Sequence, residues 1–221
     1  MYKIELVSPG NSWEKDPGVQ VIGIFELKRG QRITAALGQQ GSDRGCGSGG
    51  SFLVLESDEG PKPLLIAGGA GRGWPEQFGR GNIKQTAVGN ENVGTSGKQE
   101  FIVGHMEDVY CAGAGFHKAP RVSNLAVGCV APKSYKEGLT GGKGNCGQGG
   151  FGGGGGFYYR EVDGKGKIYY GAGGGFTGGS TKVYENEWEC LGGGGGSFSA
   201  DPNAKFDHEY VEYGYCKINR A

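Results

Sequence analysis

The sequence predicts an all-β fold, a sandwich or jelly roll of short strands that carries an additional glycine-rich layer. Runs of β-branched and aromatic residues recur at short spacing between turn-forming residues, which is typical of sandwiches and jelly rolls. Glycine supplies 50 of the 221 residues, and in the last third it forms uninterrupted runs. Helix signals are nearly absent, and only residues 103–112 form a weak helix candidate.

The composition indicates an ordered chain rather than a disordered or collagen-like one. Hydrophobic residues make up 36% of the chain and aromatic residues 11%, which exceeds what disordered segments carry. Glycine does not recur at every third position along the chain, so a collagen helix is excluded. The 23 basic and 23 acidic residues cancel, and a chain without a basic field is a poor candidate for binding nucleic acid by charge.

Two pairs of strands are expected in the first third, after an opening strand at residues 2–7. Residues 19–28 (VQVIGIFELK) and 32–37 (RITAAL) flank a short turn and predict a β-hairpin. Residues 51–56 (SFLVLE) and 63–67 (PLLIA) predict a second pair around an acidic turn.

Strands are also expected between and after the glycine runs. Residues 157–160, 167–170 and 182–188 are strand-like aromatic segments that alternate with the runs. The chain closes with residues 209–218 (EYVEYGYCKI), which read as one final strand. A strand at each end of the sequence predicts that the two termini pair in one sheet.

The glycine runs favour packed polyglycine II helices over flexible linkers. An ordered glycine loses more backbone entropy than any other residue, so an ordered run needs compensating interactions. In the threefold polyproline II conformation the N–H and C=O groups point outward, and helices without Cβ atoms can approach and bond to each other. Aromatic residues flank the runs, and the Ser/Thr tracts of linkers are missing. The structural glycines expected in this layer are Gly152, Gly153, Gly154, Gly155, Gly156, Gly173, Gly174, Gly175, Gly192, Gly193, Gly194, Gly195 and Gly196.

The cysteine pattern favours a disulfide framework in an extracellular protein. The six cysteines are even in number, and none forms a C-x-x-C pair of the kind that binds zinc or catalyses redox exchange. The sequence does not choose among the possible pairings, and six buried thiols in a cytosolic protein stay open as the alternative. No apolar run approaches the length that crosses a bilayer. The disulfide candidates are Cys46, Cys111, Cys129, Cys146, Cys190 and Cys216.

No motif indicates catalysis, a metal or a cofactor. Residues 142–147 match the dinucleotide fingerprint G-x-G-x-x-G, but the match is expected by chance in so glycine-rich a chain and has no βαβ context. The three histidines are far apart in sequence, and no serine lies in a G-x-S-x-G elbow. We therefore expect no catalytic residue, no metal site and no cofactor.

Two acidic, aromatic stretches are the candidates for a binding surface. Residues 184–189 (YENEWE) and 207–215 (DHEYVEYGY) combine carboxylates, which can steer a basic protein, with aromatic anchors. The alternative is ordinary strand alternation, with aromatic residues inward and carboxylates outward. The candidate ligand-binding residues are Glu185, Glu187, Glu189, Glu209, Glu212 and Tyr215.

Nearly the whole chain resembles the extracellular glycine-rich region of the anaplastic lymphoma kinase and leukocyte tyrosine kinase receptors. The most specific similarity lies in residues 23–41 (GIFELKRGQRITAALGQQG) and 50–71 (GSFLVLESDEGPKPLLIAGGAG). Residues 99–132 match the vertebrate pattern less well, which indicates an invertebrate relative or a divergent paralogue. Tyr215 occupies a position where the family has a ligand-contacting carboxylate. The family's glycine blocks and last strand are resembled, in order, by residues 149–157, 173–179, 192–198 and 214–218.

The resemblance implies a TNF-like jelly-roll sandwich joined to an inserted layer of polyglycine II helices. It implies one composite unit over residues 1–221, with sandwich strands mainly in 1–70 and 182–221 and the glycine-rich insertion roughly in 68–200. In that family the region lies outside the cell next to the membrane, ahead of an EGF-like module, a transmembrane helix and a cytoplasmic kinase.

The function that the resemblance implies is that of a non-catalytic, ligand-binding fragment of a receptor tyrosine kinase ectodomain. Its expected partners are a small basic cytokine-like protein and, once that ligand is bound, a second copy of the receptor. Such a chain would lie outside the cell as part of a single-pass plasma-membrane receptor, and would meet the membrane only through a segment absent from this sequence. The alternative is a secreted glycine-rich structural or adhesive matrix protein without a kinase. The large β portion argues against an ice-binding or phage-adhesin-like scaffold.

Overall fold

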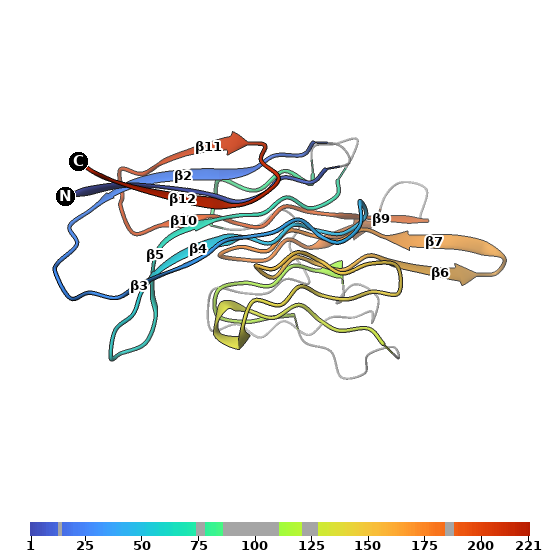
Figure 1. Ribbon diagram of the computed structural model, residues 1–221. Helices are drawn as coiled ribbons and strands as arrows, with labels where there is room; N and C mark the ends of the chain where they lie inside the picture. The colour runs from blue at the N-terminus through green and yellow to red at the C-terminus, as the bar shows by residue number, and fades with distance from the viewer. Residues whose placement is uncertain (13–14, 74–77, 86–110, 121–127, 184–187) are drawn as a thin grey trace.

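The computed structural model describes residues 1–12, 15–73, 78–85, 111–120, 128–183 and 188–221, and within them the protein is all-β. The described strands form three four-stranded sheets (Figure 1). We name them the outer sheet (order β11-β2-β1-β12), the middle sheet (β10-β5-β4-β3) and the distal sheet (β6-β7-β9-β8). The strands are β1 (Tyr2–Val7), β2 (Gly18–Phe25), β3 (Ile33–Ala36), β4 (Ser51–Leu55), β5 (Lys62–Ala67), β6 (Tyr158–Val162), β7 (Lys165–Tyr169), β8 (Thr181–Val183), β9 (Glu189–Gly192), β10 (Phe198–Ser199), β11 (Lys205–Glu209) and β12 (Tyr215–Arg220), with one short 3₁₀ turn, η1 (Tyr135–Glu137).

The outer sheet brings the two ends of the chain together. Strand β1 pairs antiparallel with β12, with Tyr2 opposite Arg220 and Val7 opposite Tyr215. Figure 1 shows the two termini side by side at one end of the molecule, with the β6–β7 hairpin projecting from the other. The expected pairing of the terminal strands is therefore confirmed.

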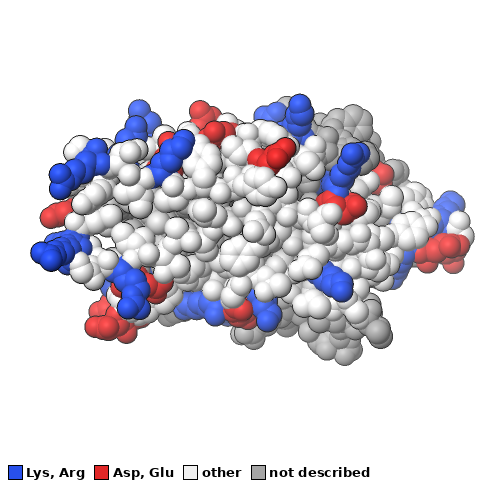
Figure 2. All heavy atoms as spheres, viewed as in Figure 1, with Lys and Arg blue, Asp and Glu red and all other residues white. Residues whose placement is uncertain are grey.

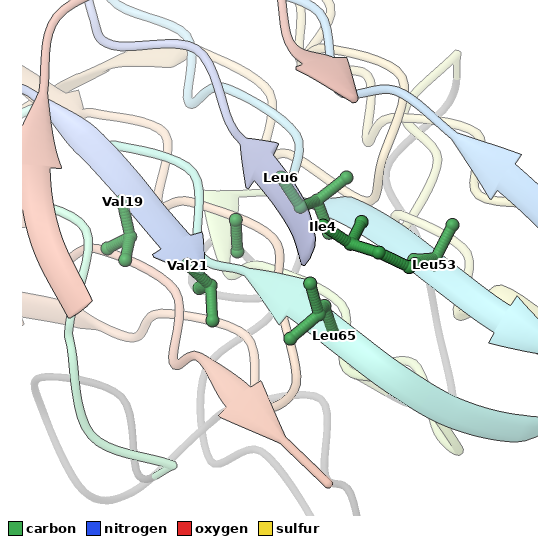
Figure 3. Close-up of a cluster of buried hydrophobic side chains, with 7 residues drawn as sticks. Ile4, Leu6, Val19, Val21, Leu53 and Leu65 are labelled. Atoms are coloured by element: carbon green, nitrogen blue, oxygen red, sulfur yellow. The ribbon is translucent and has the colours of Figure 1, made fainter. Parts of the chain in front are cut away.

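The outer and middle sheets pack face to face around one apolar core. Alternate residues of β1 and β2 point inward, as the period of two in a strand requires. Each of these fully buried side chains stabilises the sandwich by about 1.5–3 kcal/mol. The core, shown in Figure 3, is formed by Ile4, Leu6, Val19, Val21, Leu53, Leu65 and Ala67.

The middle sheet is buried on both faces. Phe52 and Val54 of β4 lie on the face away from the sandwich core and pack with Phe116 and Leu139 from the glycine-rich part of the chain. Four of the five residues of β4 are buried. This double burial explains why β4 reads as a continuous apolar run rather than as an alternating one.

The glycine-rich segments form a buried layer held by backbone hydrogen bonds. A series of backbone hydrogen bonds connects five segments of the chain. Asn82 N–H donates to Gly195 O at 2.8 Å, and Gly195 N–H donates to Gly69 O at 2.9 Å. Gly69 N–H donates to Gly174 O at 2.9 Å, and Gly174 N–H donates to Ser48 O at 3.0 Å. The glycines at 173–175 and 192–196 are buried, so these runs are packed and not exposed linkers.

Two strand predictions need correction, whereas the predicted pairing of β4 with β5 is confirmed. The expected strands at 157–160 and 167–170 are present as β6 and β7, and the structure pairs them in a hairpin. Strands β2 and β3 do not form a hairpin, because β2 lies in the outer sheet and β3 in the middle sheet. Residues 26–32 cross between the sheets, and a turn signal at Gly30 (φ +92°) suits a crossover as well as a hairpin.

The expected final strand at 209–218 is also two elements. Strands β11 and β12 occupy opposite edges of the outer sheet, so the residues between them must cross its end. Gly214 is buried in this crossing and donates its N–H to Gly38 O at 3.0 Å. The weak helix candidate at 103–112 lies outside the described residues except for Cys111 and Ala112.

Replacing Gly195 by Ala should unfold the glycine layer. An added Cβ would overlap the backbone carbonyl of Gly174 and push apart two segments that are hydrogen-bonded through Gly69. We expect a loss of about 3 kcal/mol or more in the free energy of unfolding, measured by urea denaturation. The control is Gly30→Ala, where the positive φ strains the backbone but the space is open, and which should cost about 1 kcal/mol. Equal effects of the two substitutions would contradict close packing in the layer.

Candidate functional site

The outward face of the outer sheet carries a cluster of polar side chains. Residues that pair in register share a face, so Gln20 and Tyr215, which both pair with Val7, point outward with it. Val7 has no exposed area even though it lies on this face, so neighbouring atoms cover it completely.

In this cluster, one hydroxyl group and one amide group each lie within hydrogen-bond distance of the same two carboxylates. The Tyr215 hydroxyl lies 2.7 Å from Glu5 Oε1 and 3.2 Å from Glu209 Oε1. The Gln20 amide nitrogen donates to Glu209 Oε2 at 2.8 Å and lies 3.3 Å from Glu5 Oε1. We call Glu5, Gln20, Glu209 and Tyr215 the carboxylate cluster, and each residue comes from a different strand of the outer sheet.

The carboxylate cluster changes the acidity of its members. The Tyr215 hydroxyl, which donates to Glu5, is the largest influence that lowers the pKa of that carboxyl, and Lys217 adds to the effect. Burial and the hydrogen bond to Glu5 raise the pKa of Tyr215, so its hydroxyl stays protonated and available as a donor. Lys217 Nζ lies 3.4 Å from Glu5 Oε1 and 4.4 Å from the centre of the Tyr215 ring.

Charge is distributed unevenly along this face. Asp207 is opposite Gln20 and Glu209 is opposite Gly18, so both point outward at the end of the sheet that holds Tyr215. The outward lysines, Lys3, Lys205 and Lys217, lie level with Glu5 or nearer the chain termini. The face therefore has an acidic end and a basic end, with an amide, an exposed carboxylate and a tyrosine at the acidic end.

The structure brings together only part of the predicted site. Glu209 and Tyr215 lie in the carboxylate cluster, whereas Glu212 lies exposed in the crossing between β11 and β12. Glu189 lies in β9 of the distal sheet, not on the outer sheet. Glu185 and Glu187 lie outside the described residues.

Sequence reasoning missed Glu5 and Gln20. Ile4 and Leu6 are inward apolar residues, so alternation alone places Glu5 on the outward face. The expected pairing of the termini would have put Glu5 beside the outward residues of the last strand, but only the structure gives the register that sets it opposite Lys217. Gln20 has no comparable signal, since its place beside Glu209 depends on β11 joining the edge of β2.

The predicted disulfide framework is not formed, because no disulfide joins any of the six cysteines. Cys111, Cys129 and Cys190 pack in one cluster with Tyr169, and an odd number at one place cannot pair completely. Cys46 is buried, and burial raises the pKa of its thiol to about 11. Cys216 packs against the sandwich core, and burial raises its pKa too, while Cys146 is exposed.

Within the described residues, other classes of site find little support. No three His, Cys, Asp or Glu side chains among them lie where they could hold a metal ion. No helix in the same part of the chain is long and apolar enough to cross a membrane. On the face shown in Figure 2, lysine and arginine alternate with acidic residues around a broad uncharged middle, and no single-sign field covers it.

No protein-family model matches the chain, and no curated protein matches it. The case for a function therefore depends on the geometry described above and on the resemblance in the sequence.

Replacing Tyr215 by Phe should raise the pKa of Glu5 toward its usual value. Because the pKa of Glu5 is lowered in the folded state, its ionised carboxylate stabilises the fold. This contribution is complete at pH values above the pKa of Glu5 in the unfolded chain. It is lost as the pH falls through the lower pKa of the folded state. Without the Tyr215 hydroxyl this acid-sensitive part of the stability should shrink. Carbon-detected NMR titration of the Glu5 carboxyl measures the change.

Glu59 provides the control for this titration. Its pKa is also lowered, but by Lys62, and both side chains lie in or beside the β4–β5 turn. The pKa of Glu59 should be unchanged in the Tyr215→Phe protein. An unchanged pKa of Glu5 in that variant would show that the hydroxyl is not its dominant partner.

Thiol reactivity should distinguish the exposed cysteine from the buried ones. In the folded, reduced protein a disulfide reagent such as DTNB should react fast with one thiol, Cys146, and slowly with the buried four, with the half-buried Cys216 between. Cys146→Ser should remove the fast phase. Denatured protein that was never reduced should yield six thiols, and a lower number would show that bridges form after all.

Proposed function

We propose that this chain is the ligand-binding fragment of a receptor tyrosine kinase ectodomain, and that the acidic end of its outer sheet engages a small basic cytokine-like protein. The observation that carries the proposal is the carboxylate cluster, in which four strands present Glu5, Gln20, Glu209 and Tyr215 on one exposed face.

The chemistry of the cluster suits a guanidinium or ammonium group. Two carboxylates held together by shared neutral donors keep acceptor capacity for an incoming cation, and arginine binds such oxygens in a bidentate manner. The Tyr215 ring adds an aromatic surface of the kind that anchors protein interfaces. Lys217 already lies beside Glu5 and over this ring, so a ligand cation would replace an exposed intramolecular partner rather than enter an empty site.

The finer description of the fold belongs to the same proposal. We infer that the sandwich is a TNF-like jelly roll and that the backbone-bonded glycine segments are polyglycine II helices. Lateral hydrogen bonds between segments, such as those through Gly69, are what this helix type requires, because it has no internal ones. In this role the layer is a rigid support for the sandwich, and a second receptor copy would join when ligand is bound.

The alternative function is a secreted structural or adhesive matrix protein. The buried, cross-bonded glycine layer would serve that role as well. The transcript that encodes this segment distinguishes the two: the receptor requires an EGF-like module, a transmembrane helix and a kinase after Ala221, whereas the matrix protein requires their absence.

A basic peptide tests the proposed face directly. We expect a tetra-arginine peptide, titrated at low salt and followed by NMR, to shift the amides around the carboxylate cluster on β1, β2, β11 and β12. The double variant Glu5→Gln/Glu209→Gln should weaken this binding at least about tenfold, because the two acceptors for the cation are lost.

The matched control removes the same two charges elsewhere. Glu59→Gln/Glu161→Gln acts on an exposed turn and an exposed position of β6, and should leave the shifts on the outer sheet in place. Equal weakening by both double variants would mean that the peptide responds to net charge alone, and the proposed face would be wrong. A tetra-glutamate peptide should cause no shifts there.

A further inference from the structure

A second candidate site lies between the segment that follows β3 and the start of the first glycine run. It is a cleft of about 340 Å³, within the size range of small-molecule sites. Its side chains are three amides, two hydroxyls and one aromatic ring, and none of its lining residues is charged. They are Gln39, Gln40, Ser42, Thr140, Gln148 and Phe151.

We propose that this cleft binds a neutral saccharide. A primary amide carries two donors and an acceptor on one rigid group, which matches the adjacent hydroxyl groups of a sugar ring. A hydroxyl side chain both donates and accepts, as a sugar hydroxyl does. An uncharged lining leaves no partner for a carboxylate, sulfate or ammonium group, so the ligand class is neutral.

Three of the five polar side chains of the cleft are free to act on a ligand. Within the described residues, the side chains of Gln39, Thr140 and Gln148 make no hydrogen bond, and all three are exposed. Gln40 is different, because its amide nitrogen donates to Gly10 O at 2.9 Å, which fixes the orientation of the group and leaves its carbonyl oxygen as the available acceptor.

An exposed aromatic ring completes the site. Phe151 is 39% exposed, although the glycines on either side of it, at 149–150 and 152–153, are buried. Burying an apolar ring lowers the free energy, so the exposed Phe151 ring offers apolar surface that a ligand could cover. Sugar rings present an apolar C–H face alongside their hydroxyls, and an exposed aromatic ring beside amides suits both kinds of surface.

The walls of the cleft are held in place by the backbone. Ser42 N–H donates to Gln148 O at 2.8 Å, and Gln148 N–H donates back to Ser42 Oγ at 2.9 Å. Gln39 N–H donates to Phe151 O at 2.9 Å, which joins the same two segments again. A preformed site of this kind loses little conformational entropy on binding.

Strained backbone lies next to the cleft, at Leu139. Leu139 follows the lining residue Gly138 and has a positive φ of +59°, which only Lys15 and Asp163 share among the described non-glycine residues. Leu139 O accepts hydrogen bonds from Gly152 N at 2.9 Å and Gly153 N at 3.1 Å, and the Leu139 side chain is buried against the middle sheet. Strain that is held in this way clusters at binding sites.

Another open cleft in the described part of the chain contrasts with this one. It lies between the β2–β3 crossing and the β4–β5 turn and is lined by Lys28, Arg29, Arg32, Glu56 and Asp58. Charges of both signs line that cleft, so it also offers partners for charged ligands. The uncharged lining is therefore a property of the first cleft and not of clefts in this molecule generally.

A panel of neutral oligosaccharides tests the proposal. The isotope-labelled protein would be titrated separately with hexamers of cellulose, starch, mannan and chitin type, and with a heparin hexasaccharide as the charged comparison. We expect at least one neutral hexamer to shift the side-chain amide signals of Gln39 and Gln148 and the backbone signal of Phe151 at concentrations up to about 10 mM. No shift with any neutral hexamer, or shifts with heparin alone, would overturn the proposal.

Variants tie the binding to the cleft. Phe151→Ala should weaken the best neutral ligand at least about tenfold, because the apolar face of the sugar loses its platform. Tyr159→Ala removes an aromatic ring of similar exposure (41%) from β6 and should leave the affinity unchanged. If Phe151→Ala fails to fold, Gln148→Ala serves in its place with the same expectation. Equal weakening by the cleft and control variants would overturn the assignment of the site.

Discussion

The structure depends on one constraint: a buried layer without side chains must satisfy its own backbone. In the glycine layer the N–H and C=O groups of neighbouring segments bond across the layer, from Asn82 through Gly195, Gly69 and Gly174 to Ser48. Because segments approach this closely, a single Cβ at Gly195 would meet a carbonyl oxygen. Cohesion here comes from hydrogen bonding and close contact of main chain, where most domains rely on interlocking side chains.

The middle sheet joins the glycine layer to the rest of the molecule, because it packs against both. One of its faces supplies Leu53 and Leu65 to the sandwich core, and the other packs Phe52 and Ile66 against residues of the glycine-rich part. Neither layer could be removed without exposing one apolar face of β4 and β5. The glycine-rich part is thus integral to the sandwich, and the outer sheet presents its other face, which carries the carboxylate cluster, away from the core.

The two proposed sites use this scaffold in different ways. The carboxylate cluster needs four strands side by side, since its members come from β1, β2, β11 and β12, and it offers charge and an aromatic ring on an open face. The saccharide cleft needs two cross-bonded segments at the edge of the glycine layer, and it offers neutral polar groups in a recess. Partners of opposite chemistry, a basic protein and an uncharged sugar, could therefore be bound without competition for the same groups.

Local patterns in the sequence predict the all-β class, most strand positions, the pairing of the terminal strands and the packed state of the glycine runs. The strand positions follow from local patterns such as the alternation in residues 2–7 and the apolar run of β4. The packed state of the glycine runs follows because an ordered but isolated run would have nothing to offset its loss of backbone entropy. The tertiary structure alone decided that β2 and β3 lie in different sheets and that β11 and β12 lie at opposite edges. A turn signal marks where a chain bends but not which sheet it enters next. The tertiary structure also brings Glu209 and Tyr215 together with Glu5 and Gln20. These hydrogen bonds join residues about 200 positions apart, so they depend on the order of strands in the sheet, which no local sequence pattern encodes.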